Sequence, residues 1–520
     1  MFKLDNLYEN HQSLTMKLKS IFFILFFSGF SVFAQQSVEK WKIFELTLKG
    51  PDTGNPFIDA RIGGKFIHMK DTLSVSGFYD GNGVYKIRFM PQKEGKWSYQ
   101  TFSNIKSLNK KKGVFTCTSA SKNNHGPVAV KDTLYFAYAD GTPHHSFGTT
   151  CYGWVHQGDS LAELTLQTLS KGYFNKIRMC IFPKSYDWNH NEPLFYPFEG
   201  TPPKNWNYTR LNPVFFQNIE KRIGQLDSLG IEADLIVFHP YDRWGFCSMN
   251  RETDDLYINY IIARFAAYKN VWWSMANEYD YMSAKKLSDW DYYISQFAKK
   301  DVFHHLISIH NGPRIYDHTN PLITHASIQG EDTYKAKEYR AKYKKPIIFD
   351  ECRYEGNIPW SWGNMTPQSM TEKFWRGIMN GGYVGHGETY VTENPVKNPG
   401  ESSDILWWSK GGVLRGESPE RILFLRKIIE SAPPKLKPIN LFTWMPFSAI
   451  GIDKEFYLAY FNDAQPHSTI IQLPENATFN VEIIDTWNMT ITPLKKQFSG
   501  KSLIELPGKP YIALRITKKS

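Results

Sequence analysis

The sequence predicts an α/β protein, a (β/α)8 TIM barrel flanked by an N-terminal β-sandwich and a small C-terminal β-sandwich. Residues 35–127 consist of short alternating strands separated by turns, whereas residues 128–432 alternate apolar strands with helical patterns. After the Pro-rich break APPKLKP, residues 433–520 return to short strands. The length of 520 residues exceeds one ordinary domain and suits this division.

The first residues predict an exported protein. In MKLKSIFFILFFSGFSVFAQQ (16–36), Lys17 and Lys19 precede an apolar run that begins at Ile21 and is too short for a membrane span. Val32-Phe33-Ala34 offers a cleavage site after Ala34. We therefore expect residues 1–34 to be a secretory signal peptide, with Met16 as the true start. The mature protein is expected to be periplasmic, on the outer surface or extracellular, with no membrane span.

The two flanking regions have the pattern of antiparallel sandwiches. The N-terminal strands, in an Ig-like arrangement, are expected in WKIFELTLKG, ARIGGKFIHM, GVYKIRFMP and GKWSYQTFSN. The C-terminal strands are expected in EFYLAYF, STIIQL, FNVEIIDTW, SLIELP and PYIALRIT.

The central region contains eight candidate strands with helices between them, as a closed barrel requires. The strands are expected within 145–154, 174–183, 231–240, 271–278, 304–310, 322–329, 346–352 and 382–390. The helices are expected within 160–173, 213–230, 253–270, 283–301, 333–345, 366–380 and 418–432. The fifth unit is the weakest, because NGPRIYDHTN after His310 is too short for a good helix.

The composition favours a carbohydrate ligand over nucleic acid. Aromatic residues make up 16% of the chain, and flat aromatic faces suit the apolar faces of sugar rings. The net charge is +10, and it becomes +9 without residues 1–34 because three Lys, one Asp and one Glu are lost (10 − 3 + 2). The basic residues are dispersed, so a nucleic-acid partner is not expected. An acidic polysaccharide remains open.

Two glutamates end strands that face each other across a barrel. VWWSMANEYD places Asn277-Glu278 at the end of strand four, and PIIFDEC places Asp350-Glu351 at the end of strand seven. Active sites of such barrels lie at the carboxyl ends of the strands. Two carboxyl groups about 5 Å apart suit a retaining glycosidase, whereas a wider gap admits water and gives inversion.

SMANEYD and IIFDEC resemble the acid/base and nucleophile strands of clan A retaining glycoside hydrolases. This resemblance implies that Glu278 is the general acid/base and Glu351 the nucleophile. It further implies that Asn277 binds the sugar 2-hydroxyl and that Arg178, on strand two, contacts the nucleophile. The tyrosine that the clan often carries on strand six is replaced here by His325, which puts that role in doubt.

A closer resemblance spans nearly the whole mature chain. NPF, GFYDGNGVYKIRFMPQKEGKWSY, DILWWSKGGVLRGESPERILFLRKI and DTWNMTI are similar to exported apiosidase-like glycosidases of polysaccharide-degrading bacteria. The resemblance to that family implies a sandwich, a clan A barrel and a second sandwich. It indicates the domain architecture more firmly than the identity of the sugar that is cleaved.

Further candidates for substrate binding lie at or after the strand ends. Strands three, five and eight supply His239, His310 and His386, which could bind hydroxyls or orient carboxylates, and Asp242 and Glu388 are weaker candidates. The clan commonly places an aromatic sugar platform where Trp407 and Trp408 stand. The pocket walls are expected from Trp154 and the loop 186–208.

No metal or other cofactor is expected. The chain has no HExxH and no GxSxG motif, and its five cysteines form no CxxC pair. Cys352, which follows a candidate catalytic residue, is more simply a buried thiol.

The expected function is retaining hydrolysis of plant or algal poly- or oligosaccharide by an exported enzyme. Two alternatives stay open: a non-catalytic carbohydrate-binding barrel and a lyase that acts on an acidic glycan. The sugar, the linkage, exo or endo action, the oligomeric state and carbohydrate binding by the sandwiches are not determined by the sequence.

Overall fold

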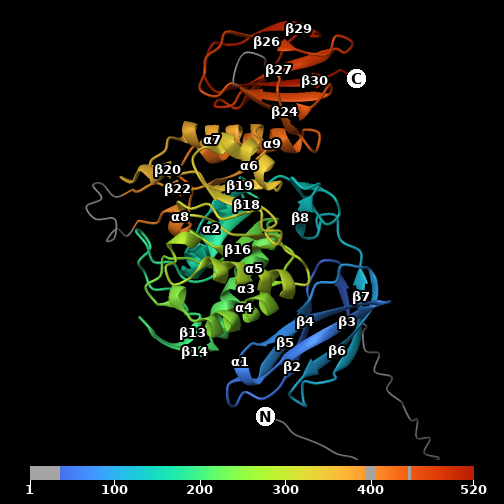
Figure 1. The fold of residues 1–520 in the computed structure, drawn as a ribbon, viewed down its shortest axis with the longest axis vertical. Coiled ribbons are helices and arrows are strands. Elements are labelled where there is room, and N and C mark those ends of the chain that lie inside the picture. Colours follow the sequence, from blue (N-terminus) through green and yellow to red (C-terminus); the bar gives the residue numbers. More distant parts are fainter. Residues whose placement is uncertain (1–35, 393–403, 443–446, 520) are drawn as a thin grey trace, which may run out of the picture.

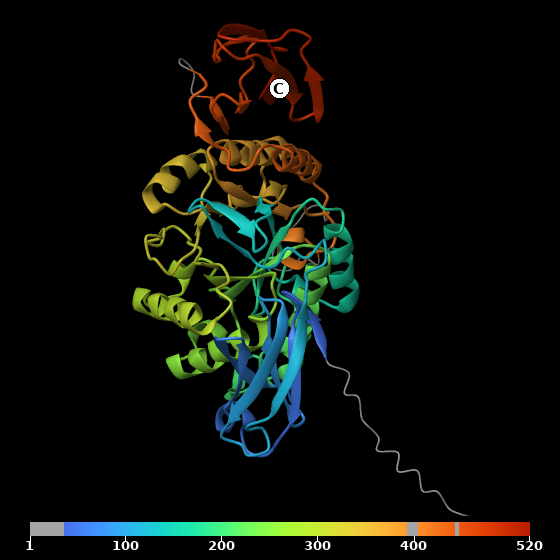
Figure 2. The same cartoon turned by 90° about the vertical axis from the view of Figure 1, so that its right-hand side faces the viewer.

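A computed structural model of the chain describes residues 36–392, 404–442 and 447–519. Three domains follow one another along the long axis of the molecule (Figure 1). The N-terminal sandwich packs against the helices of a central barrel, and the C-terminal sandwich stands on the opposite side, above α7 (Pro367–Met379) and α9 (Ser418–Glu430) (Figures 1 and 2). The predicted signal peptide lies outside the described residues.

The N-terminal domain is a seven-stranded sheet that folds over on itself at β4, in the order β1-β7-β6-β3-β4-β5-β2. The first six residues of β4 pair with β3 and its last three residues pair with β5. Aromatic side chains such as Phe44, Phe66 and Phe115 fill the space between the layers. The elements are β1 (Ser37–Glu39), β2 (Phe44–Lys49), α1 (Pro56–Asp59), β3 (Ile62–His68), β4 (Asp71–Tyr79), β5 (Val84–Phe89), β6 (Gly95–Ser103) and β7 (Lys112–Thr118).

The central domain is the predicted barrel, and it is nearly closed. Its eight parallel strands run in the order β17-β16-β15-β12-β11-β21-β19-β18, and a single parallel bridge between His310 and Ser327 joins the two ends of this series. The strands in chain order are β11 (Phe147–Thr150), β12 (Lys176–Cys180), β15 (Glu232–Phe238), β16 (Val271–Ala276), β17 (Ile307–Ser308), β18 (Ala326–Gln329), β19 (Ile347–Glu351) and β21 (Tyr383–His386). The prediction of a (β/α)8 barrel is confirmed.

The helices surround the barrel as the apolar periodicity predicts. They are α2 (Asp159–Leu169), α3 (Pro213–Ser228), α4 (Arg251–Phe265), α5 (Leu287–Lys300), α6 (Ala336–Tyr343), α7 (Pro367–Met379), the short α8 (Trp407–Lys410) and α9 (Ser418–Glu430). Side chains of Asn212, Asn250 and Thr366 cap the amino ends of α3, α4 and α7. Residues 309–325, between β17 and β18, contain no helix, which agrees with the weak fifth unit.

Short elements close the two ends of the barrel. A three-stranded sheet of β8 (Val128–Lys131), β9 (Tyr135–Tyr138) and β10 (Pro143–His144) packs Phe136 against Trp272 at the amino end. Loops at the carboxyl end carry the hairpin of β13 (Phe198–Thr201) and β14 (Asn205–Leu211), and the pair β20 (Glu355–Gly356) and β22 (Glu388–Thr389).

A buried ion network joins the N-terminal sandwich to the barrel. Arg88 on β5 donates to the Glu220 carboxylate on α3, and Arg264 on α4 donates to the same carboxylate at 2.7 Å. Arg264 also pairs with Asp80, after β4, at 2.8 Å. Because each buried charge has an opposite partner, the two domains are held in one relative orientation.

The C-terminal domain is a sandwich of a six-stranded and a two-stranded sheet around one core. Its strands are β23 (Lys437–Ile439), β24 (Ser448–Ile452), β25 (Phe456–Tyr460), β26 (Ser468–Gln472), β27 (Phe479–Asp485), β28 (Thr490–Pro493), β29 (Lys501–Glu505) and β30 (Ile512–Lys518). Each of the five predicted segments overlaps one of these strands. Across the three described ranges, no helix is both long enough and apolar enough to cross a membrane.

Candidate active site

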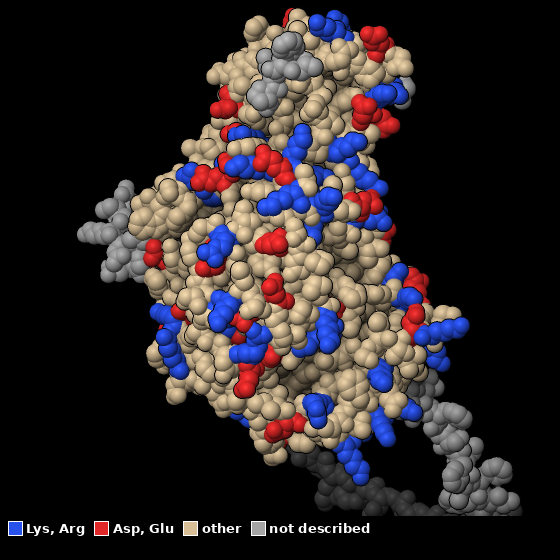
Figure 3. Space-filling model, in the orientation of Figure 1, with Lys and Arg blue, Asp and Glu red and all other residues tan. Residues whose placement is uncertain are grey.

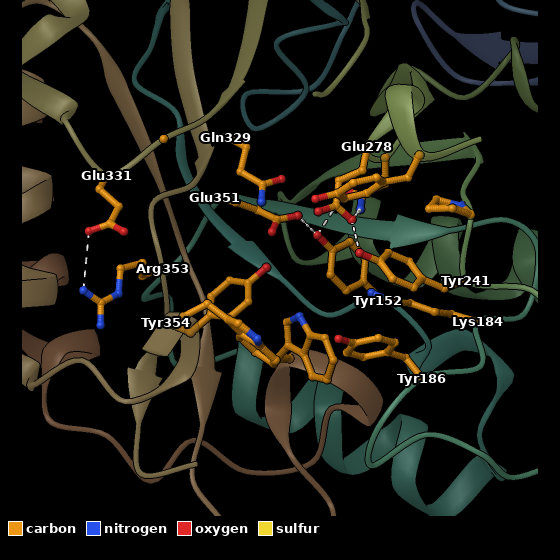
Figure 4. A pocket seen from close by; sticks show the side chains of 16 residues that line it. Tyr152, Lys184, Tyr186, Tyr241, Glu278, Gln329, Glu331, Glu351, Arg353 and Tyr354 are labelled. Carbon is orange, nitrogen blue, oxygen red and sulfur yellow. Dashed lines mark hydrogen bonds and ion pairs between the residues drawn. The ribbon is translucent and has the colours of Figure 1, made fainter. Parts of the chain in front are cut away.

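A cavity of about 700 Å³ opens at the carboxyl ends of the barrel strands (Figure 4). Both predicted catalytic glutamates face it. Its lining residues are Tyr152, Lys184, Tyr186, Pro240, Tyr241, Asn277, Glu278, Tyr281, Gln329, Gly330, Glu331, Glu351, Arg353, Tyr354, Trp362 and Trp408.

Glu278 stands where β16 ends and the backbone changes direction. Its φ of 47° and ψ of 56° lie in the left-handed region, which a residue with a side chain enters at a cost of about 1–2 kcal/mol. Consecutive side chains of a regular strand point to opposite faces. The turn at Glu278 breaks that alternation, so that both Asn277 and Glu278 line the cavity.

Glu351 is the last residue of β19, and an irregularity in the neighbouring strand sets its surroundings. The β18–β19 register shifts between Ile328 and Gln329, which pairs Gln329 with Glu351 and brings both into the cavity lining. The preceding Asp350 points to the other side, into the barrel interior, where Lys176 donates to it at 2.6 Å. Glu351 is therefore the carboxylate of this pair that can meet a substrate.

A chain of polar contacts connects the two glutamates (Figure 4). The Tyr152 hydroxyl donates to Glu351 Oε1 and lies 3.1 Å from Asn277 Oδ1. Asn277 Nδ2 donates to Glu278 Oε2 at 3.1 Å. Arg178, which has only donors, contacts Asn277 Oδ1 at 2.9 Å and so turns the amide nitrogen toward Glu278. The two carboxylates are thus held by one connected set of side chains.

Burial raises the pKa of both glutamates. Desolvation raises the pKa of Glu351 to about 7, against the opposing effect of the Tyr354 hydroxyl. Desolvation likewise raises the pKa of Glu278, although contact with the Tyr241 hydroxyl and the charge of Lys184 both lower it. Near neutral pH the site can therefore hold one protonated and one ionised carboxyl group, as acid-assisted displacement requires.

The floor of the cavity is a fully buried polar layer inside the barrel. Ser327 donates to Asp350 at 2.5 Å, and its oxygen lies 3.0 Å from His310 Nδ1. Ser327 uses its single proton for Asp350, so His310 Nδ1–H donates to the Ser327 oxygen. The other ring nitrogen, His310 Nε2, lies 3.4 Å from Glu351 Oε1. Burial lowers the pKa of His310, so the ring is neutral. These contacts link the ends of β17, β18 and β19 beneath the cavity.

The model of the family described as "Apiosidase-like, catalytic domain" matches residues 130–433, more than half of the chain. The chain belongs to the apiosidase-like family. Two regions outside this match also have family models, each described as a domain of unknown function: DUF5060 at residues 37–104 and DUF5605 at residues 444–517. No curated protein matches the chain.

Solved structures agree with this assignment. A Bacteroides vulgatus protein described as a "putative glycoside hydrolase" is 41% identical, with 93% of this chain and 100% of that chain covered at a TM-score of 0.88. A family 5 glycoside hydrolase from the same organism is 13% identical, with 76% and 94% covered at a TM-score of 0.59, so it shows a similar fold only.

In this apiosidase-like chain, four of the ten predicted site residues line the cavity: Asn277, Glu278, Glu351 and Trp408. Three others are buried away from it. His239 Nε2 contacts the Phe182 carbonyl, His386 Nδ1 contacts Thr149, and Trp154 is fully buried in the short helix η1 (Trp154–His156). His310 lies in the floor just described.

Two expected contacts are corrected. Arg178 forms ion pairs with Asp350 at 3.5 Å and Asp234 at 4.0 Å, and its role is to orient Asn277 rather than to contact Glu351. Trp407 is fully buried and donates its Nε1–H to Thr149 at 2.8 Å, so it offers no face to a sugar. The helix α8 turns these neighbouring rings in different directions, and Trp408 alone reaches the cavity.

The weaker candidates have structural roles. Asp242 accepts hydrogen bonds from the backbone N–H groups of Trp244, Gly245 and Cys247, and Glu388 accepts them from Arg415 and Gly416. Each carboxylate holds a loop in place. Cys352 is fully buried, as expected.

Several cavity residues are not among the predictions. Tyr152 follows β11, Lys184 follows β12 and Tyr241 follows β15, whereas Tyr186 lies in the predicted wall loop 186–208. A systematic reading of all eight strand ends would have found Tyr152, because TTCYGW ends strand one as clearly as SMANE ends strand four. Strand six carries no tyrosine beside Glu351, and the Tyr152 hydroxyl makes that contact instead. His325, on strand six, packs on Trp272 at the other end of the barrel.

Tyr152 is expected to set the acidic limb of the pH profile. An ionised Glu351 is needed for attack, so kcat/KM should fall about tenfold per pH unit below a pKa near 7. The Tyr152→Phe variant loses the hydroxyl that donates to the carboxylate, which favours the protonated acid and should move this limb to higher pH. The measurement is kcat/KM against pH for both proteins. A lower rate with an unmoved limb would show that Tyr152 does not control Glu351.

Proposed function

We propose that this chain is a retaining glycoside hydrolase that cleaves glycosidic bonds of plant or algal poly- or oligosaccharides by double displacement. The observation that carries the proposal is the convergence of Glu278 and Glu351, from the ends of β16 and β19, on one cavity with a shared hydrogen-bond chain. Both pKa values are raised, which is the condition for one carboxyl group to begin protonated.

In the first step, Glu351 attacks the anomeric carbon while Glu278 protonates the leaving oxygen. Glu278 Oε2 already contacts Asn277 and Tyr241, so Oε1 is the oxygen that can carry the transferable proton. The C–O bond to the leaving group breaks as the bond to Glu351 forms, which gives a covalent glycosyl-enzyme.

In the second step, Glu278 removes a proton from water, which attacks the same carbon and releases Glu351. Two inversions return the original anomeric configuration. Asn277 is placed beside both carboxylates and would bind the sugar 2-hydroxyl, while Trp408 and Trp362 would support the apolar face of the ring.

The comparisons support the general class. The apiosidase-like family match and the relative at 41% identity both point to glycoside hydrolysis. Retention, the class of glycan and export are our proposals; export is supported by the N-terminal sequence MKLKSIFFILFFSGFSVFA. Within the described residues, no group of three or more His, Cys, Asp or Glu side chains is placed to hold a metal ion.

The test begins with a panel of pectic, hemicellulosic and algal glycans, from which released sugars are identified by anion-exchange chromatography. On a cleaved glycan, proton NMR should show the first-formed product with the anomeric configuration of the substrate. A product of opposite configuration would contradict double displacement. Release of unsaturated uronate that absorbs in the ultraviolet would indicate a lyase, and binding without cleavage would indicate a carbohydrate-binding barrel.

A further inference from the structure

Lys184 is a buried lysine whose ammonium group faces the cavity. It follows β12, and only 5% of the residue is exposed. Its Nζ lies 3.7 Å from the ring centre of Tyr152, 4.3 Å from that of Tyr241 and 4.8 Å from that of Trp408 (Figure 4). These contacts hold the charge in place and stabilise it in part.

No described residue accepts a hydrogen bond from this ammonium group or forms an ion pair with it. The two other buried lysines of the described ranges differ in this respect. Lys176 pairs with Asp234 at 3.0 Å and Asp350 at 2.6 Å, and Lys285 donates to Asp254 and to the Met249 carbonyl. A buried charge without an acceptor is costly, and the cost rises when a ligand displaces the water of the cavity.

The other cation of the cavity already has partners. Arg353 pairs with Glu331 at 3.4 Å and donates to the Ser361 carbonyl. On the face of the molecule in Figure 3, basic and acidic side chains are interspersed, so no broad basic surface there would gather an acidic glycan. Of the two described cations that line the cavity, Lys184 is therefore the one left to recognise charge.

We propose that Lys184 binds an anionic substituent, a carboxylate or a sulfate, on the sugar that occupies the cavity beside Glu278. The inference rests on the proposed glycosidase function and names the substrate class of that site. An anion supplies the acceptor that the ammonium group lacks, and it does so where the bond is cleaved.

The neighbourhood of Glu278 favours an anion over a neutral hydroxyl group. The charge of Lys184 lowers the pKa of Glu278, which opposes the protonated state that a general acid needs. An anionic substituent would neutralise that charge and favour protonation of Glu278, whereas a hydroxyl would leave it in place. Substrate binding would thus prepare the acid for proton transfer.

The test uses matched pairs of glycans. Pectic oligosaccharides are compared with the same material after reduction of its carboxyl groups, and a sulfated algal glycan with its desulfated form. Wild type should cleave one charged member with a kcat/KM roughly tenfold to a hundredfold above that of its neutral partner. The pair that shows this preference distinguishes carboxylate from sulfate.

In the Lys184→Met variant, which keeps an apolar chain among the rings, the charged-to-neutral ratio should fall at least about tenfold, mainly through KM. Lys184→Arg should retain part of the preference. Lys204→Met, at an exposed lysine outside the cavity, is the control, and thermal unfolding checks that each variant folds.

Equal or faster cleavage of the neutral partners by wild type would overturn the inference and leave the proposed function intact. So would an equal loss on both partners in Lys184→Met. Failure of wild type to hydrolyse any glycan, charged or neutral, would instead count against the proposed function.

Discussion

Replacement of Glu351 by Gln is expected to lower turnover at least about 10⁴-fold on an aryl glycoside of the sugar that wild type releases. The amide keeps the shape of the side chain but cannot attack the anomeric carbon. Its Oε1 position, in contact with Tyr152, should keep the site assembled. The measurement is kcat under saturating substrate, with binding of the released sugar as evidence of an intact cavity.

Glu331→Gln is the matched control, because Glu331 is another cavity carboxylate but pairs with Arg353 rather than with the Tyr152–Asn277 chain. Its loss should be far smaller. Turnover in Glu351→Gln close to that of wild type would remove Glu351 as the nucleophile.

Replacement of Glu278 by Ala should give a loss that depends on the leaving group. General acid catalysis raises the reaction rate about 10²–10⁴-fold. The reaction depends on this contribution most when the leaving group is a poor one. With a dinitrophenyl glycoside the first step needs little protonation, so the covalent intermediate should accumulate while its hydrolysis is slow. The measurement is a burst of dinitrophenol followed by a slow steady state.

Azide distinguishes the two roles, since it attacks without general-base help. In Glu278→Ala it should restore turnover and give a glycosyl azide of retained configuration. In Glu351→Ala it should take the place of the nucleophile and give the inverted azide. An inverted azide from the Glu278 variant would exchange the two assignments.

The strand ends were the most predictable part of this site. A buried strand that stops at a polar pair, as β16 does at Asn277-Glu278 and β19 at Asp350-Glu351, shows its end in the sequence because the run of apolar residues ends there. The barrel topology then brings parallel strand ends to one rim. For that reason Glu278, Glu351 and the domain architecture could be predicted from local patterns.

Contacts that depend on side-chain direction were less predictable. Arg178 is on the expected strand, yet it reaches Asn277 and Asp350 because it points into the barrel interior. Trp407 and Trp408 are adjacent in sequence, and only the path of α8 determines which ring is buried. Histidines at strand ends are equally able to fill the interior, as His239 and His386 do.

The order of the elements, the barrel between two sandwiches and the two glutamates follow from the sequence alone, because apolar periodicity and strand ends are local properties of the chain. The three-dimensional fold alone shows that Tyr152 contacts Glu351, that Arg178 orients Asn277 and that Lys184 lies among aromatic rings with no acceptor among the described residues. These features join residues far apart in the chain, and they depend on closure of the barrel and on the loops that cover its rim.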